Sequence, residues 1–147
     1  MSAPYARLAV AVATSTVVMF LLTYAMLATF DHFYANLNRA YMAVLMAAPM
    51  AVVMIVVMGH MYADRRRNAA IVGASAAVFV LVLALMRTQW PIADAQFLRS
   101  MIPHHSSAIV MCERARLDDP RIVALCRDIV DTQRREIALM RELLRSR

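Results

Sequence analysis

Two long stretches of the sequence contain no Asp, Glu, Lys or Arg, one from Leu8 to Phe30 and one from Ala40 to Ala63. A helix needs about 20 mostly apolar residues to cross a bilayer, so either stretch is long enough. A third apolar segment covers 69–88. With 62% hydrophobic residues and only two Gly, the chain is expected to be all-α, with three transmembrane helices over about 6–30, 40–62 and 69–88.

The orientation of these spans follows from three consecutive arginines, Arg65 to Arg67, in the short loop between the second and third spans. The positive-inside rule places such a loop in the cytoplasm. The amino terminus is then also cytoplasmic, while the first loop and everything after Trp90 lie outside. The apolar run after Arg7 exceeds the roughly 7–15 residues of a signal peptide core, so it is expected to remain as an anchor.

Composition changes sharply after Trp90, where most of the remaining charge is found. We therefore divide the chain into a membrane domain, 1–90, and a polar domain, 91–147. The formal net charge of +6 suits orientation in a lipid bilayer better than nucleic-acid binding, because no basic stripe with interleaved aromatics is present.

The polar domain is expected to form an antiparallel helical hairpin. Asp94 can start one helix, and Asp119 followed by Pro120 is typical of the start of another. Two helices bury little apolar surface, so the hairpin is expected to pack against a second copy, giving a homo-oligomer, or against the membrane helices. The predicted inner face of the second helix comprises Ile122, Cys126, Ile129, Gln133, Ile137, Met140 and Leu144.

Two adjacent histidines, His104 and His105, lie in the first helix of this hairpin, with Met101 and Met111 on either side. At about 100° per residue, these four side chains fall within about 120° of one helix face. Imidazole with thioether favours copper, particularly Cu(I), with Ag(I) as a mimic. Methionine at helical spacing is also common in protein cores, so spacing alone leaves a metal site and plain packing both open.

The segments "QFLRSMIPHHSSAIVM" and "IVDTQRREIALMREL" resemble the bacterial family known as domain of unknown function 305. This resemblance covers about 94–144 and implies a ferritin-like half-bundle, held at the bacterial inner membrane, that binds copper outside the cytoplasm and contributes to copper tolerance, storage or transfer. It implies supporting roles for Gln133 and Glu136 beside the metal. The implied metal ligands are Met101, His104, His105, Met111 and Met140.

The two cysteines, Cys112 and Cys126, depart from the family pattern. Both fall on inner faces at similar distances from the predicted turn. Helix axes usually lie about 8–10 Å apart, whereas a disulfide needs Cα atoms within about 7 Å, so buried free thiols are expected first. A disulfide and an additional copper ligand remain as alternatives.

A row of methionines recurs every fourth residue through the second span, from Met42 to Met58. Such a row can pack between membrane helices or relay Cu(I) across the membrane. We expect it to contact other membrane helices or a second copy, rather than lipid. His32, in the first loop, is expected to be solvated.

Enzymatic functions are weakly supported, so the chain is not expected to be an enzyme. Ser106 and Ser107 adjoin the histidines, but the nucleophile elbow of a hydrolase is missing. No Glu stands three residues before His104 or His105, as a di-iron oxidase requires. The main alternative to copper binding is a metal-free membrane protein whose hairpin mediates oligomerisation.

Overall fold

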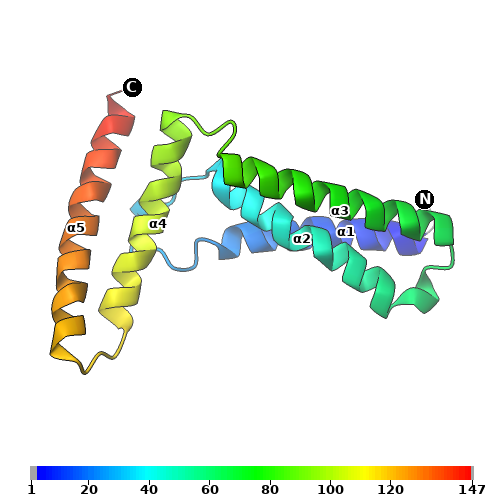
Figure 1. The fold of residues 1–147 in the computed structure, drawn as a ribbon, viewed down its shortest axis with the longest axis horizontal. Helices are drawn as coiled ribbons and strands as arrows, with labels where there is room; N and C mark the ends of the chain where they lie inside the picture. Colours follow the sequence, from blue (N-terminus) through cyan, green and yellow to red (C-terminus); the bar gives the residue numbers. More distant parts are fainter. Residues whose placement is uncertain (1–2, 147) are drawn as a thin grey trace. The chain divides into compact units, whose positions relative to one another are not determined.

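A computed structural model describes residues 3–146 and is all-helical over that range, as predicted (Figure 1). Residues 1, 2 and 147 lie outside this description. The expected cytoplasmic location of the amino terminus therefore concerns residues that the structure does not describe. The chain divides into two compact units, residues 3–23 with 38–91 and residues 24–37 with 92–146. The helices are α1 (Ala3–Leu22), α2 (Leu37–Val57), α3 (Arg65–Thr88), α4 (Asp94–Arg114) and α5 (Pro120–Arg145), with 3₁₀ helices at Phe30–His32 and Gly59–Met61.

The first three helices have boundaries that differ from the expected spans. α1 ends at Leu22 rather than at Phe30, because the following residues form a separately packed segment. α2 ends at Val57, where a short 3₁₀ helix takes over. α3 starts four residues earlier than expected because the Asp64 side chain accepts hydrogen bonds from the backbone N–H groups of Arg66 and Arg67.

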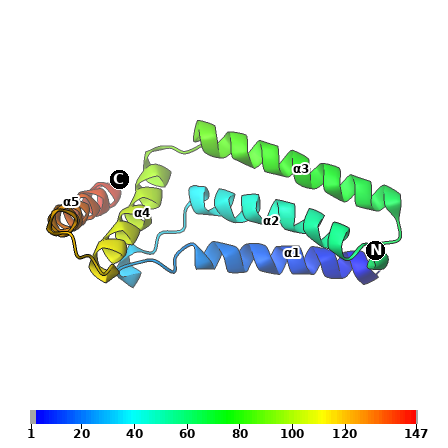
Figure 2. The same cartoon turned by 60° about the horizontal axis from the view of Figure 1, so that its bottom comes forward.

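The first unit contains α1, α2 and α3 side by side (Figure 2). Each of the three is long and apolar enough to cross a membrane. Their outward surfaces are largely apolar, with Val10, Val56 and Val80 each more than half exposed. Ala43, Ala47 and other small residues of α2 are buried, which allows close helix packing.

One end of this unit is held by a cluster around Tyr5, Leu8, Ile55 and Tyr62. The Tyr5 hydroxyl donates to Asn68 Oδ1 at 2.8 Å and accepts from the backbone N–H of Asp64 at 3.2 Å. These bonds connect the start of α1 to the start of α3. The three arginines lie between Asp64 and Asn68, and Tyr5 of α1 forms a hydrogen bond with each of these two residues.

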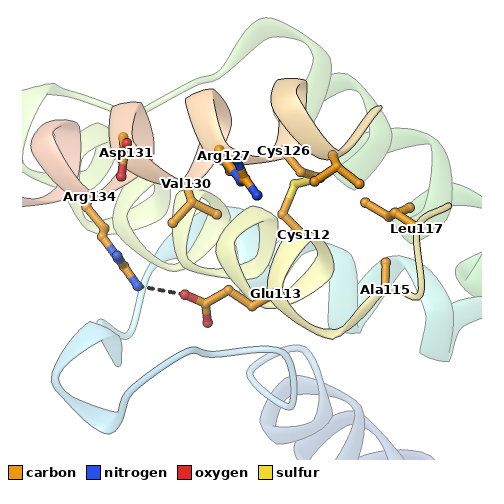
Figure 3. Close-up of a pocket in the computed structure, with 10 residues that line it drawn as sticks. Cys112, Glu113, Ala115, Leu117, Cys126, Arg127, Val130, Asp131 and Arg134 are labelled. Carbon is orange, nitrogen blue, oxygen red and sulfur yellow. Dashed lines mark hydrogen bonds and ion pairs between the residues drawn. A yellow bond between two sulfur atoms is a disulfide. The ribbon is translucent and has the colours of Figure 1, made fainter. Parts of the chain in front are cut away.

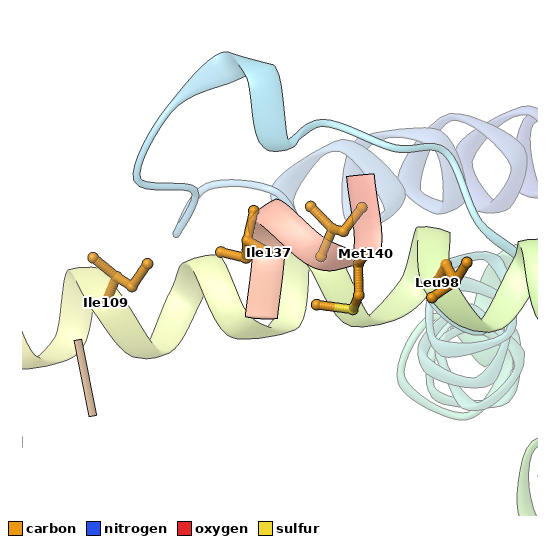
Figure 4. Packing of buried hydrophobic residues seen from close by; sticks show 5 residues of the cluster. Leu98, Ile109, Ile137 and Met140 are labelled. Atoms are coloured by element: carbon orange, nitrogen blue, oxygen red, sulfur yellow. The ribbon is translucent and has the colours of Figure 1, made fainter. Parts of the chain in front are cut away.

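The second unit combines α4 and α5, called here the α4–α5 pair, with the segment 24–37. The core of the pair contains Leu98, Ile102, Ile109, Ile137 and Met140 (Figure 4). Its most deeply buried side chains belong to α4, where Ile102, Pro103 and Ser106 are less than 2% exposed. The middle of α4 is thus the most deeply buried part of the unit.

Segment 24–37 covers one flank of α4. The Ser106 hydroxyl accepts a hydrogen bond from the backbone N–H of Ala28 at 2.8 Å. The side-chain amide of Asn36 donates to the carbonyl of Arg99, and the backbone N–H of Leu37 donates to Gln96 Oε1. The sequence predicted residues 24–30 as the end of the first span and only residues 31–37 as part of a loop, and the polar contacts of this segment with α4 were not foreseen.

Candidate metal-binding face of the α4–α5 pair

The starts of both helices match the sequence prediction. α4 begins at Asp94, and α5 begins at Pro120 with Asp119 as the N-cap, whose carboxylate accepts from the backbone N–H of Arg121 at 2.8 Å. α4 continues through Pro103, and the Ser107 hydroxyl donates to the Pro103 carbonyl at 2.9 Å. The two histidines therefore lie on a regular helix.

Contacts along the α4–α5 pair show that the two helices run in opposite directions. Cys112 and Cys126 are joined near the turn, whereas His105 meets Glu136 farther along. Ile137 and Met140 pack among the apolar residues of α4. Ile122 was expected on the inner face of α5 but is 46% exposed. The contact between the two helices ends near the Cys112–Cys126 disulfide, and Ile122 lies beyond it, closer to the turn.

The cysteines form a disulfide, so the first expectation of free thiols is wrong. Their Cα atoms lie only 5.3 Å apart, since the two helices converge towards the short turn instead of keeping the usual axial spacing. Beside the disulfide is a shallow pocket in which Arg134 donates to Glu113 at 2.6 Å (Figure 3). None of the five predicted metal ligands lines this pocket.

His105 occupies the interface between α4 and α5, with a side chain only 13% exposed. Its Nδ1 is buried and lies 3.0 Å from Glu136 Oε2, although the ring N–H is not aligned for a hydrogen bond. Burial lowers the pKa of His105, the Glu136 carboxylate opposes this effect, and the neighbouring His104 adds to it. The imidazole is therefore neutral at pH 7, which is the form that binds metals.

Two of the predicted thioether ligands lie beside this histidine. Met101, one helical turn before His105, packs against the core cluster that includes Met140. Met140 itself is 8% exposed. The structure therefore packs Met101 with Met140, one helical turn from His105, and places Glu136 against His105. Gln133, the other residue expected to support the site, is partly buried on α5.

The other two predicted ligands are on a different side of α4. His104 is exposed and Met111 is 59% exposed. At about 100° per residue, they lie about 160° and 180° around the helix from the buried Ile102. The His104 and His105 rings nevertheless remain neighbours, with centroids 5.8 Å apart. Among the described residues, no group of three or more His, Cys, Asp or Glu side chains is placed to hold a metal.

His32 is not simply solvated, as the sequence suggested. Its Nδ1 lies 2.9 Å from the Ser106 hydroxyl, and burial together with Arg141 lowers its pKa, against a smaller opposing effect of Asp31. No sequence signal could have linked these two residues, which are 74 positions apart.

The methionine row of α2 is divided. Met54 and Met58 pack against the cluster around Tyr5, whereas Met42 and Met46 are 45% and 43% exposed. Packing explains the first two within a single chain. Contact of the other two with a second copy stays a prediction.

A family model described as "Domain of unknown function (DUF305)" matches residues 53–144. The chain belongs to this family. The DUF305 match includes all of α3 and α4 and most of α5, so it extends well beyond the segment in which the resemblance was first found. The chain is also 36% identical over 115 residues to "Uncharacterized protein L153" of Acanthamoeba polyphaga mimivirus, covering 76% of this chain and 73% of that protein. No solved structure matches this DUF305 protein.

Proposed function

We propose that this DUF305 protein is a membrane-anchored copper-binding protein that holds Cu(I) outside the cytoplasm. The observation that carries the proposal is a neutral, nearly buried histidine, His105, backed by Glu136 and adjoined by Met101 and Met140. A protein with this site serves copper tolerance, storage or transfer. Silver, as Ag(I), is the expected mimic.

The donor chemistry of this region suits a soft monovalent ion. Histidines that bind metals commonly direct their second ring nitrogen towards a carboxylate, which fixes the tautomer and raises the basicity of the coordinating nitrogen. With Nδ1 of His105 facing Glu136, Nε2 is the nitrogen for the metal. The thioethers of Met101 and Met140 add soft donors that need no deprotonation. His104 and Met111 lie on another side of α4, so we propose that they bind copper only together with donors of a second copy.

The proposed topology has three transmembrane helices followed by an antiparallel, ferritin-like helical hairpin formed by α4 and α5. Segment 24–37 and α4 belong to one unit, and the two membrane crossings between them, α2 and α3, put these two parts on the same side. The Cys112–Cys126 disulfide favours an oxidising compartment, such as the outer side of the bacterial inner membrane. The cluster Arg65 to Arg67 then faces the cytoplasm.

Oligomerisation without metal is the second candidate function. It is favoured by large apolar side chains on the outer side of α5, where Leu125 is 57% exposed and Leu139 is 55% exposed. Such residues are unusual on a helix surrounded by water. A copper-binding measurement distinguishes the two candidate functions. Copper binding requires the histidines, whereas association through the apolar surface of α5 does not.

The decisive test is metal analysis of the full-length protein, purified from membranes after loading with Cu(I), Ag(I) or Zn(II) in separate samples. We expect Cu(I) and Ag(I) to be retained and Zn(II) to be lost on washing. Changing both histidines, His104→Ala with His105→Ala, should abolish tight Cu(I) binding in competition with a chelator. A matched double change at Ser107→Ala and Ala108→Ser keeps the helix and should retain copper. Full Cu(I) affinity in the double histidine variant would reject the site.

A further inference from the structure

α5 carries a second, more exposed row of mostly apolar residues beside its α4-facing side, and Glu136 of this row also contacts His105 of α4. Ile122, Leu125, Leu139 and Leu143 are between 44% and 57% exposed, and Ile129 between them is partly exposed. With Thr132 and Glu136, these residues follow one another at alternating steps of three and four. This spacing is typical of a helix that packs along its length against another helix.

The row lies on the open flank of the α4–α5 pair. Ile137, which faces the core, and Leu139 on the row are about 160° apart on an ideal helix, so a single neighbouring helix does not cover both. Segment 24–37 covers the flank of α4 on which Ser106 lies. The exposed Phe97 and Met111 belong to the other side of α4. A two-helix unit with one flank covered and one flank apolar is half of a four-helix bundle.

Charged residues along one edge of the row identify its partner. These are Arg121, Asp128, Arg135 and Glu142, spaced by seven residues. In paired helices this edge position forms the ion pairs that set orientation and register. Among the described residues, the side chains of Asp128 and Glu142 form no ion pair within the chain.

We propose that this face binds a second copy of the chain, with the two α5 helices antiparallel about a two-fold axis at the level of Asp131 and Thr132. In this register Asp128 lies opposite Arg135 of the second copy, and Arg121 lies opposite its Glu142. Both pairs then attract, and symmetry repeats each of them. Ile122 packs against Leu139 of the second copy.

In the neighbouring registers of the two helices, like charges face each other at these positions. Moving one helix by a heptad in one direction places Arg135 against its own counterpart and Asp128 against Glu142. Moving it in the other direction places Asp128 against its own counterpart and Arg121 against Arg135. Like charges at such positions are unfavourable, so the pattern selects one antiparallel pairing of identical helices. A lipid surface or an unrelated helix would not require this self-complementary order.

This dimer does not depend on copper, so its test uses the metal-free, full-length protein in detergent micelles. Sedimentation equilibrium at matched detergent density should give the mass of two chains. Replacing the two most exposed leucines of the row, Leu125→Gln with Leu139→Gln, should weaken association by at least about tenfold, because each copy loses two large apolar contacts. Both side chains are more than half exposed, so helix content should not change.

Charge reversal tests the register. Asp128→Arg places like charges together twice per dimer and should weaken association by about tenfold. Adding Arg135→Asp in the same chain restores opposite charges and should recover dimerisation to within about threefold. Arg127→Asp, a charge reversal of equal size on the opposite side of α5 from the row, should have no effect. A monomeric unmodified protein, a dimer unaffected by the leucine changes, or no recovery in the double reversal would each overturn the proposal.

Discussion

Nδ1 of His105 lies 3.0 Å from Oε2 of Glu136, between a nearly buried imidazole and a carboxylate that is 46% exposed. The carboxylate can therefore influence the pKa of the histidine while it stays in contact with water. Its charge raises the pKa of His105 against the larger, opposite effect of burial. This balance keeps the ring neutral at pH 7.

Removing the Glu136 charge should weaken copper binding without removing a copper ligand. We expect Glu136→Gln to lower the Cu(I) affinity by about tenfold or more, as is typical when the hydrogen-bonding partner of a metal-bound histidine is changed. Competition with a Cu(I) chelator measures the effect. Asp131→Asn removes one negative charge from the exposed side of the same helix and should leave the affinity unchanged. Equal affinities in both variants would separate Glu136 from the metal site.

The metal-free second unit should lose stability as the solution becomes acidic. The pKa values of His105 and His32 are lowered in the folded chain, so below about pH 6.5 the unfolded chain binds protons first. The stabilising contribution is fully present above the unfolded pKa and is lost as pH falls through the folded pKa. Amide hydrogen exchange in α4, measured between pH 7.5 and 5, should show increased opening after correction for intrinsic rates.

A His105→Gln variant should show a smaller pH dependence than the unmodified protein, because one of the two titrating groups is gone. His60→Gln should show the same pH dependence as the unmodified protein, since His60 lies in the first unit. Protection of α4 that does not change with pH would contradict the lowered pKa of both histidines.

The disulfide should stabilise the α4–α5 pair. The bonded cysteines are 14 residues apart, and closing a loop of about this length contributes about 3 kcal/mol by restricting the unfolded chain. Cys112→Ser with Cys126→Ser should therefore increase exchange of α5 amides by roughly a hundredfold. Copper affinity should persist, because the sulfurs are joined to each other. A thiol assay on unreduced, unfolded protein should find no free cysteine.

The membrane orientation makes a prediction about both sides of the bilayer. A reporter that is active only in the cytoplasm should stay silent when fused after Arg147 and should be active when inserted at Ala63. The basis is the basic cluster Arg65 to Arg67, which forms the start of α3 directly after the short connection from α2. A strong signal from the carboxyl-terminal fusion would overturn the proposed topology.

The sequence predicted the helices well where the signals were local. Asp119 with Pro120 marked the start of α5 correctly, because an N-cap and a first-turn proline act within one helical turn. The lengths of the apolar segments predicted three apolar helices correctly but placed the end of α1 too far along the chain. The residues after Leu22 are apolar enough to continue a helix, but the Tyr24 hydroxyl donates to the carbonyl of Tyr34 in a separate folded segment. Tertiary contacts decided that boundary.

The candidate site was partly predictable for the same reason. Helical geometry placed Met101 one turn before His105 and brought Met140 near Met101, and these two methionines belong to one packed cluster. It could not show where the inner face of α4 is centred, because that depends on which residues α5 covers, and so Met111 was grouped with residues on another side. The cysteines were judged from an average helix spacing, whereas the local convergence near the turn decides whether they can bond.

The bond between Ala28 and Ser106 joins residues that are 78 positions apart and separated by two complete apolar helices. A ribosome adding roughly 5–20 residues per second needs roughly 4 to 16 seconds to make the intervening chain. During that time segment 24–37 has no surface to pack against. The second unit can therefore form only at the end of synthesis, after α3 has been made, and a chain shortened to begin at α4 would leave Ser106 without its cover.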